Sequence, residues 1–486
     1  MPSLNPNGTP VKVGRATLRT PGLSGEARAH MPATAEMRAA EMTMESLDRA
    51  LDAHAALPQE SIEITNTVEH HDPATELRSA GSAEPEIEVQ YPAPNEDYAQ
   101  VLMAVDESGA ITWNFPVTTK PVEDAIRGEA MTTYRIRRTT PPTPAPKEAE
   151  SRGVVGAIGK KLLKVLVFPL IDPIVGKAAE RYAAHWEARN RPYALRSFRP
   201  DSFSRPLAGG VDVAEVIRGR ALLMIHGTFS RTHSAFGDLP SAFVQTLHDM
   251  YGGRVFAFDH PTMSEDPTKN VEWFSAHFPA ASPVEVDVIC HSRGGLVTRV
   301  LAEQPTAAPM INVRRAVFVA APNAGTALSD DKHMGDFIDT YTNVLNFFPG
   351  NGVTETLEAV IAVVKQLAVS SLKGLSGLQS MNPKGTYLKG LNAATAEKRE
   401  YFALTSDYEP KEDGLKMFVA NRLIDRVFDG KGNDLVVPTE GVYAGNGATP
   451  LFPISNKHSF DQKDGVMHTR FFRNGFAQQK VLEWLR

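Results

Sequence analysis

The sequence contains very little cysteine: Cys290 is the one thiol among 486 residues. A single thiol cannot close an intramolecular disulfide, and it cannot build a cysteine-rich zinc site. Long apolar runs are also missing, because lysine and proline interrupt every candidate before it reaches the ~18–20 residues of a membrane-spanning helix. Residues 1–15 lack the apolar core of a secretory signal. We therefore expect a cytoplasmic protein, unless it is exported by a route that needs no cleaved signal.

An excess of positive charge is absent as well. The formal net charge is -6, so the composition gives no electrostatic reason to expect a nucleic-acid partner. His70, His71 and Asp72 are adjacent, but no third group at ligand spacing accompanies them. We expect no metal and no cofactor. The length predicts more than one domain, with a prior of about 100–200 residues for each.

The first part of the chain divides by composition. Residues 1–85 are predicted to be weakly ordered, apart from a helix at 36–57, where Met and Leu recur on one face. Residues 86–138 hold short runs typical of strands and predict a small β module. The Pro-rich stretch 139–152 is interpreted as an extended linker.

Residues 153–204 begin with an apolar stretch that two prolines interrupt. We interpret this segment as helices that pack on the following domain. A peripheral membrane contact is the alternative, because Lys160, Lys161 and Lys164 lie beside the apolar run.

From residue 205 to 486 strand-like runs alternate with helix-like stretches. Such alternation predicts an α/β fold, a mainly parallel sheet with helices on both faces. Residues 328–395 interrupt the pattern with a partly apolar insertion, which we expect to form a helical cap or lid. The predicted strands are 221–225, 254–259, 284–290, 316–321 and 401–406.

The most informative stretch is 284–303, where a strand runs into a serine, then into glycines, then into a helix. A serine at such a bend projects above the end of the sheet, beside the free N–H groups of the helix. The residues CHSRG resemble the G-x-S-x-G nucleophile elbow of the α/β-hydrolases, and HSRGG resembles the corresponding segment of bacterial lipases and esterases. Cys290 replaces the first glycine. The resemblance implies that Ser292 is the nucleophile, with His291 and Gly294 in supporting positions.

A second resemblance lies upstream, where the strand 221–225 ends in His226 and Gly227. In lipase-like members of the fold, the residue after this His-Gly pair supplies half of the oxyanion hole. The resemblance implies that the main-chain N–H groups of Thr228 and Arg293 form the hole.

A serine hydroxyl needs an adjacent base to act as a nucleophile at neutral pH. In this fold the chain order is Ser, then acid, then His. His468 precedes a C-terminal amphipathic helix, as the histidine of lipase-like hydrolases does, and is our candidate base. His333 also follows Ser292, and His458 is the alternative base.

The acid is assigned to Asp434, because the segment GNDLVVP resembles the one that carries the catalytic aspartate in bacterial lipases. Asp429 and Asp407 are the alternatives, and each of them also fits a turn.

The sequence thus predicts a serine hydrolase of the α/β-hydrolase fold that cleaves carboxylic esters, with a hydrophobic acyl substrate favoured. Thioesterase, amidase or acyltransferase chemistry on the same triad remains open, as do a catalytically inactive interaction protein and a secreted antibacterial lipase. The prediction requires that the Ser292 hydroxyl is accessible and that one of the late imidazoles, His458 or His468, reaches it.

Overall fold

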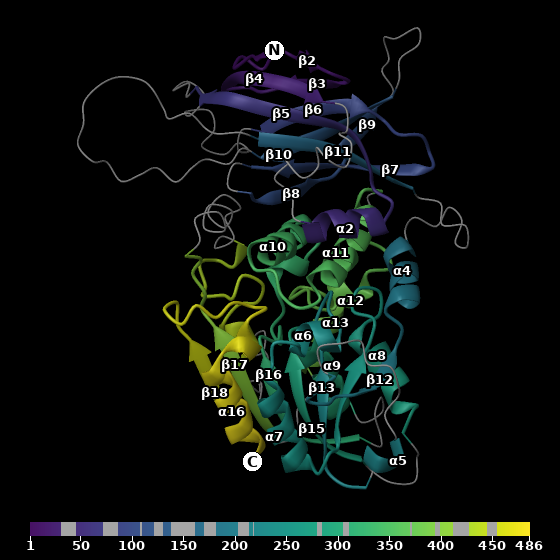
Figure 1. Ribbon diagram of the computed structural model, residues 1–486, viewed down its shortest axis with the longest axis vertical. Coiled ribbons are helices and arrows are strands. Elements are labelled where there is room, and N and C mark those ends of the chain that lie inside the picture. The colour runs from purple at the N-terminus through teal and green to yellow at the C-terminus, as the bar shows by residue number, and fades with distance from the viewer. Residues whose placement is uncertain are drawn as a thin grey trace, which may run out of the picture. The chain divides into compact units, whose positions relative to one another are not determined.

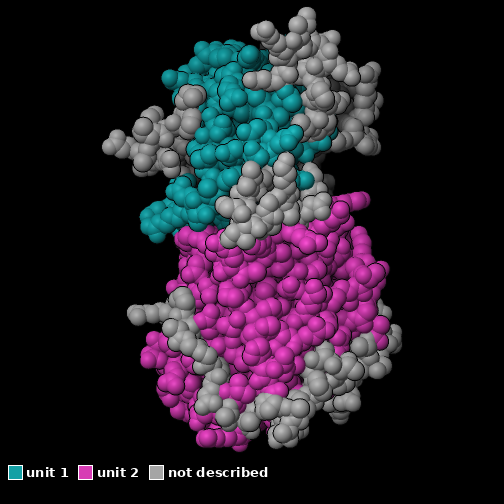
Figure 2. Space-filling view, turned by 90° about the vertical axis from the view of Figure 1, so that its right-hand side faces the viewer, with its two compact units in different colours: residues 1–180, 361–372, 412–422 teal, residues 181–360, 373–411, 423–486 magenta. Residues whose placement is uncertain are grey.

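The structure is a computed structural model, and it divides into two compact units (Figures 1 and 2). Unit 1 comprises residues 1–180, 361–372 and 412–422, and unit 2 comprises residues 181–360, 373–411 and 423–486. The structure describes residues 1–30, 45–70, 86–106, 109–120, 130–137, 161–169, 181–202, 213–216, 218–278, 284–304, 311–369, 372–393, 399–411, 427–444 and 454–486.

Unit 1 is built from two β-sheets whose paired strands are all antiparallel. The six-stranded sheet has the order β1 (Ser3–Leu4), β4 (Leu23–His30), β5 (Leu57–Glu69), β11 (Lys161–Pro169), β7 (Tyr98–Val105) and β8 (Ile111–Asn114). The five-stranded sheet has the order β2 (Val11–Val13), β3 (Ala16–Arg19), β6 (Glu86–Pro92), β10 (Met131–Arg137) and β9 (Thr118–Lys120). Helix α2 (Glu45–Ala53) precedes β5.

The prediction that residues 1–85 are weakly ordered is wrong for the described part of that segment. Strands β1 to β5 place small apolar side chains at alternating positions, and these side chains are buried against those of β6 and β10. The alternation was hidden in the sequence because β1 to β3 are short and many of the outward positions are polar. Of the helix predicted at 36–57, the structure describes α2, which ends at Ala53, while residues 36–44 lie outside the described residues.

The helical interpretation of 153–204 is correct for α4 (Tyr182–Asn190) but wrong for two other described segments, Lys161–Pro169 and Ala194–Ser197, which are strands. Lys161–Pro169 form strand β11, which pairs with β5 on one side and β7 on the other. Leu163, Val165 and Phe168 are fully buried. The apolar run that suggested a membrane contact is therefore an inner strand of a sheet. The linker at 139–152 lies outside the described residues.

Unit 2 contains a seven-stranded sheet of α/β type (Figure 1). Its order is β12 (Ala194–Ser197), β14 (Val255–Asp259), β13 (Ala221–Ile225), β15 (Val284–His291), β16 (Ile311–Val319), β17 (Glu400–Ser406) and β18 (Ile454–Phe460). Only the pairing of β12 with β14 is antiparallel among these described strands. The predicted strands correspond to β13, β14, β15, β16 and β17, and the mainly parallel sheet with helices on both faces confirms the α/β prediction.

Helices cover both faces of this sheet because its strands are apolar on both sides. On one face, α7 (Ser241–Tyr251) and α16 (Gly475–Leu485) share a core with the side chains of Leu222 and Met224. On the other face, Phe258 packs edge-on against Phe274 of α8 (Pro267–Ser275), and α8 in turn contacts α9 (Gly294–Glu303). The remaining short elements of unit 2 are α4 (Tyr182–Asn190), α5 (Val213–Val216), α6 (Thr232–Phe236), η2 (Ala327–Ser329), η3 (Glu440–Val442) and η4 (Phe471–Arg473).

The strand order reverses beside β13. From β13 the chain moves outward to β14, and it then returns across β13 to β15 before continuing to β16, β17 and β18. In an open parallel sheet, ligands bind outside the carboxyl ends of the strands at such a switch point. The carboxyl ends of β13 and β15 carry the His-Gly pair and Ser292, so the topology places both motifs at this crevice.

The insertion at 328–395 is helical. It contains α10 (Met334–Phe347), α11 (Val353–Leu367), α12 (Ser376–Gln379) and α13 (Thr386–Ala393). Helices α10, α12 and α13 lie beyond the carboxyl ends of β13 and β15 (Figure 1). No helix within the described residues is both long and apolar enough to cross a membrane.

Candidate active site

The turn after β15 holds Ser292 in a strained conformation. Its φ is +52°, in the left-handed region that non-glycine residues seldom adopt. Space is short around the turn: a Cβ on Gly294 would lie 2.5 Å from the carbonyl oxygen of Ile225, and a Cβ on Gly295 would lie 2.4 Å from the Cβ of Ala321. Glycine is therefore required at both positions after Arg293, and the bend presents Ser292 at the end of the sheet.

The structure brings Ser292, His468 and Asp434 together. The Nε2 atom of His468 lies 3.0 Å from the Oγ atom of Ser292, and its Nδ1 atom lies 2.9 Å from the Oδ2 atom of Asp434. All three residues are buried. An imidazole held between a hydroxyl and a carboxylate has the geometry of a general base, in which the carboxylate fixes the ring and its tautomer.

Asp434 is itself held by its own loop. Its Oδ1 atom accepts hydrogen bonds from the main-chain N–H groups of Val436 at 3.0 Å and Val437 at 2.8 Å. The main-chain N–H of His468 donates to the carbonyl oxygen of Asp434 at 3.2 Å. One carboxylate oxygen is thus occupied by the turn, and the other is left for His468.

His291, which precedes the serine, supports the base. Its Nε2 atom lies 2.8 Å from the carbonyl oxygen of His468, so the ring donates this bond from Nε2–H. Burial lowers the pKa of His291 to about 3, and the ring is neutral at neutral pH. His291 therefore ties the loop of His468 to the strand that carries the serine.

The two amides predicted for the oxyanion hole belong to the loops that follow β13 and β15: Thr228 follows Gly227, and Arg293 follows Ser292. Ile225 at the end of β13 is in register with Cys290 of β15. A Cβ on Gly227 would lie 2.5 Å from the Cβ of Ser292, which shows how closely the two loops approach. Among the described residues, the main-chain N–H groups of Thr228 and Arg293 have no acceptor. Two unsatisfied amides beside a serine hydroxyl can bind a developing oxyanion.

The requirement for an accessible hydroxyl is not met, because Ser292 is only 1% exposed. Tyr341 of α10 lies beside the site: its ring stands edge-on to the ring of His468 at 6.2 Å. Burial raises the pKa of the Tyr341 phenol, whereas the neighbouring Ser292 lowers it. A residue of the insertion thus lies next to the buried serine.

A cavity of about 70 Å³ lies at the site. Thr228, His468 and Tyr341 are among the residues that line it. Its remaining walls mix apolar and charged side chains, among them Leu345, Phe348, Asp238, Arg470 and Arg473.

The alternative candidates lie elsewhere. His458 is on β18, where its ring contacts Phe460 and Phe476. His333 is bound to Asp330, with 2.7 Å between Nδ1 and Oδ1. Asp407 accepts a hydrogen bond from Gln462 at 3.2 Å, and Asp429 lies in a turn with φ of +55°.

Cys290 occupies the first position of the elbow as a buried residue. Its thiol donates to the carbonyl oxygen of Val317 at 3.4 Å, and burial raises its pKa to about 12.

The side chain of Arg293 is buried and points into the protein, where it donates to Asn270 at 3.1 Å and to the carbonyl oxygens of Gly377 and Glu265. Within the described residues, no cluster of three or more His, Cys, Asp or Glu could hold a metal ion.

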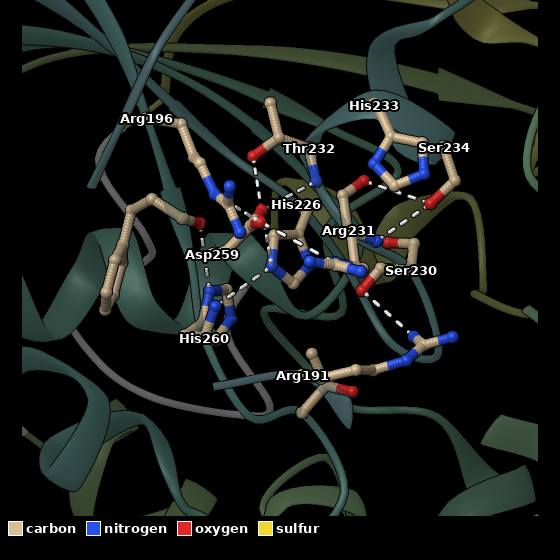
Figure 3. A network of polar contacts seen from close by, with 12 residues as sticks. Arg191, Arg196, His226, Ser230, Arg231, Thr232, His233, Ser234, Asp259 and His260 are labelled. Carbon is tan, nitrogen blue, oxygen red and sulfur yellow. Dashed lines mark hydrogen bonds and ion pairs between the residues drawn. The ribbon is translucent and has the colours of Figure 1, made fainter. Parts of the chain in front are cut away.

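Sequence reasoning missed the polar network that surrounds the His-Gly loop (Figure 3). Asp259, at the end of β14, accepts a hydrogen bond from Arg196 at 3.0 Å and two from Thr232, at 2.9 Å from its N–H and at 2.6 Å from its hydroxyl. Arg191, next to α4, donates to the carbonyl oxygen of Phe229 at 2.5 Å. Nothing in the sequence links residues 191, 196 and 259 to the loop.

Comparison with known proteins gives one family and several similar structures. The structures include a lipase from Bacillus licheniformis (12% identity, 60% of this chain and 97% of that chain, TM-score 0.35) and lipase 1 from Pelosinus fermentans (11% identity, 54% and 95%, TM-score 0.36). A probable hydrolytic enzyme from Pseudomonas aeruginosa is similar at 16% identity over 55% of this chain and 86% of that chain, with a TM-score of 0.34. No curated protein matches the sequence. Residues 190–486 match the model of the family described as a domain of unknown function, DUF7379, and the chain belongs to that family.

Proposed function

We propose that this protein is a serine hydrolase that cleaves carboxylic esters through an acyl-enzyme. The observation that carries the proposal is the continuous chain of contacts from the Ser292 hydroxyl through His468 to Asp434, at 3.0 Å and 2.9 Å. The strained φ of Ser292 supports the same proposal, because strain of this kind is held in place at functional sites.

In the proposed mechanism, the Oγ atom of Ser292 attacks the ester carbonyl while His468 takes its proton. The carbonyl oxygen becomes negatively charged and accepts hydrogen bonds from the N–H groups of Thr228 and Arg293, each of which contributes about 3 kcal/mol to stabilisation of the transition state. His468 then returns the proton to the leaving alcohol. Water repeats the sequence on the acyl-enzyme and releases the acid.

Substrate access requires that part of the surrounding structure moves, because Ser292 is buried. We propose that the insertion at 328–395, which includes Tyr341, acts as a cap, and that substrate enters through the cavity lined by Thr228 and His468. The apolar side chains Leu345 and Phe348 along that cavity favour a hydrophobic acyl group, whereas Arg470 and Arg473 make part of its wall polar.

The proposal is tested with a fluorophosphonate probe and with p-nitrophenyl esters of increasing acyl length, together with a thioester and an anilide. Labelling and hydrolysis should disappear in Ser292→Ala and His468→Ala. Ser459→Ala, an exposed serine on β18, and His458→Ala, the alternative base, are matched controls that should keep both. Activity that survives Ser292→Ala would refute the proposal, and a preference for the thioester or the anilide would correct the substrate class.

A further inference from the structure

The peptide between Gly227 and Thr228 joins the oxyanion hole to a buried histidine. A peptide unit is planar and trans, so its C=O and N–H point in opposite directions. The carbonyl oxygen of Gly227 and the N–H of Thr228 belong to the same unit. Whatever fixes the direction of this carbonyl therefore also fixes the direction of the amide that faces the substrate.

Three groups hold the carbonyl oxygen of Gly227. The Nδ1 atom of His226 lies 3.0 Å from it, the hydroxyl of Ser230 donates to it at 2.8 Å, and the N–H of Ser230 donates at 3.4 Å. His226 is 1% exposed, so water does not compete for this bond. The imidazole and Ser230 together fix the direction of the carbonyl.

The contacts of His226 assign its tautomer. Its Nε2 atom accepts a hydrogen bond from the main-chain N–H of His260 at 3.2 Å, so this nitrogen carries no proton and Nδ1 carries it. The ring stacks on that of His260, with 4.2 Å between centroids. The reverse tautomer would lose both bonds.

The charged groups around His226 do not replace its two hydrogen bonds or protonate its ring. Asp259 is 3.8 Å from Nε2, too far for a hydrogen bond, and its oxygens are engaged by Arg196 and Thr232 (Figure 3). The pKa of the imidazole is lowered to about 4: burial is the largest cause, Asp259 and the bond to Gly227 oppose it, and Arg191 and Arg231 add to it. The ring is thus neutral at neutral pH, with one donor and one acceptor.

We propose that His226 is a positioning residue for the oxyanion hole, which through the Gly227 carbonyl orients the N–H of Thr228 toward the reacting carbonyl oxygen. This inference rests on the proposed function of Ser292. His226 should therefore affect kcat rather than substrate binding, because the aligned N–H of Thr228 interacts most strongly with the charge of the transition state.

Two matched substitutions separate the bonds of the ring. His226→Asn keeps a donor at the δ position, where it can reach the Gly227 carbonyl, but loses the acceptor for His260. His226→Gln does the reverse, because its amide group lies at the ε position. It keeps an acceptor for the N–H of His260 and loses the donor to the Gly227 carbonyl. We expect His226→Asn to keep kcat within about 3-fold of the original protein, and His226→Gln to lower kcat by about 10- to 100-fold with little change in KM.

Equal loss of kcat in both variants, or a loss that follows their melting temperatures, would show a packing role and overturn the inference. The tautomer gives a readout that is independent of activity: ¹⁵N NMR of histidine-labelled protein should assign the proton of His226 to Nδ1, and a proton on Nε2 would also overturn it. If Ser292→Ala keeps its activity, the proposed function itself fails. If Ser292→Ala is inactive while the Asn and Gln variants are alike, only the role of His226 fails.

Discussion

A side chain at residue 227 would collide with Ser292: a Cβ on Gly227 would stand 2.5 Å from the Cβ of Ser292 and 2.9 Å from the carbonyl oxygen of His291. Neither neighbour is the free end of a flexible side chain, so the two loops must separate to accept any larger residue. Close approach of two main chains is a position where glycine is needed for its size. The distance between the ends of β13 and β15 therefore depends on this residue.

We expect Gly227→Ala to lower kcat/KM by at least about 100-fold, because a displacement of about 1 Å in a catalytic group has an effect of that size. Ester hydrolysis with the best p-nitrophenyl substrate measures the loss. Gly390→Ala in α13 is the matched control, since a Cβ there meets nothing within 4 Å. This control should keep the activity and raise the free energy of unfolding by about 0.5–1 kcal/mol. A Gly227→Ala protein with unchanged turnover would contradict the tight contact.

The acid of the triad is tested by removing its charge. Asp434→Asn keeps the shape of the side chain, but its amide cannot stabilise the charged imidazole and favours the wrong tautomer of His468. The expected loss in kcat is about 10⁴-fold. Asp429→Asn, in a turn, should retain the original rate. If the two variants exchanged these results, the assignment of the acid would move to Asp429.

Tyr341 provides a test of the cap. Tyr341→Ala removes a ring of the proposed cap that lies beside His468, so we expect labelling by the fluorophosphonate probe to become several-fold faster. The same change leaves a void beside Phe229 and Phe337, whose rings lie 5.0 Å from that of Tyr341, and should lower the free energy of unfolding by about 3–5 kcal/mol. Tyr341→Phe keeps the ring and should label more slowly than Tyr341→Ala. Slower labelling in Tyr341→Ala than in the original protein would mean that the tyrosine assists the reaction rather than covering the serine.

Buried neutral histidines predict how stability depends on pH. Burial lowers the pKa of His226 to about 4 and that of His291 to about 3, and it lowers the pKa of His260 well below its ordinary value. The unfolded chain binds a proton at each of these rings near pH 6.5, whereas the folded protein does not, so stability falls as pH falls through this range. Between pH 7 and pH 5 each ring contributes a loss of about 2 kcal/mol.

Urea unfolding at several pH values measures this loss. His291→Asn should be less stable at pH 7 but should lose about 2 kcal/mol less between pH 7 and pH 5. His277→Asn, at an exposed position, is the control and should keep the full dependence. An unchanged dependence in His291→Asn would mean that this imidazole is already charged in the folded protein.

The parallel sheet and the meeting of Ser292, His468 and Asp434 could be predicted because the signals are local. A buried strand such as 221–225 is apolar throughout, and Ser292 lies between a strand and a helix that each have a clear pattern. The position of Tyr341 beside His468 and the contact of Arg191 with Phe229 could not be predicted, because both join segments more than 30 residues apart. The strand Lys161–Pro169 was mistaken for a helix for a related reason: a strand buried on both sides is apolar without alternation, and its partners decide its conformation.

Strand β11 also determines where an expressed N-terminal fragment can end. It lies between β5 and β7 in its sheet, although the Pro-rich stretch at 139–152 separates it from every other strand of that unit. A fragment that stopped in this stretch would leave both neighbouring strands with unpaired N–H and C=O groups, which invite pairing with another molecule. Soluble expression of the first unit therefore requires a boundary beyond Pro169, and during synthesis its larger sheet stays open until the ribosome has passed that residue.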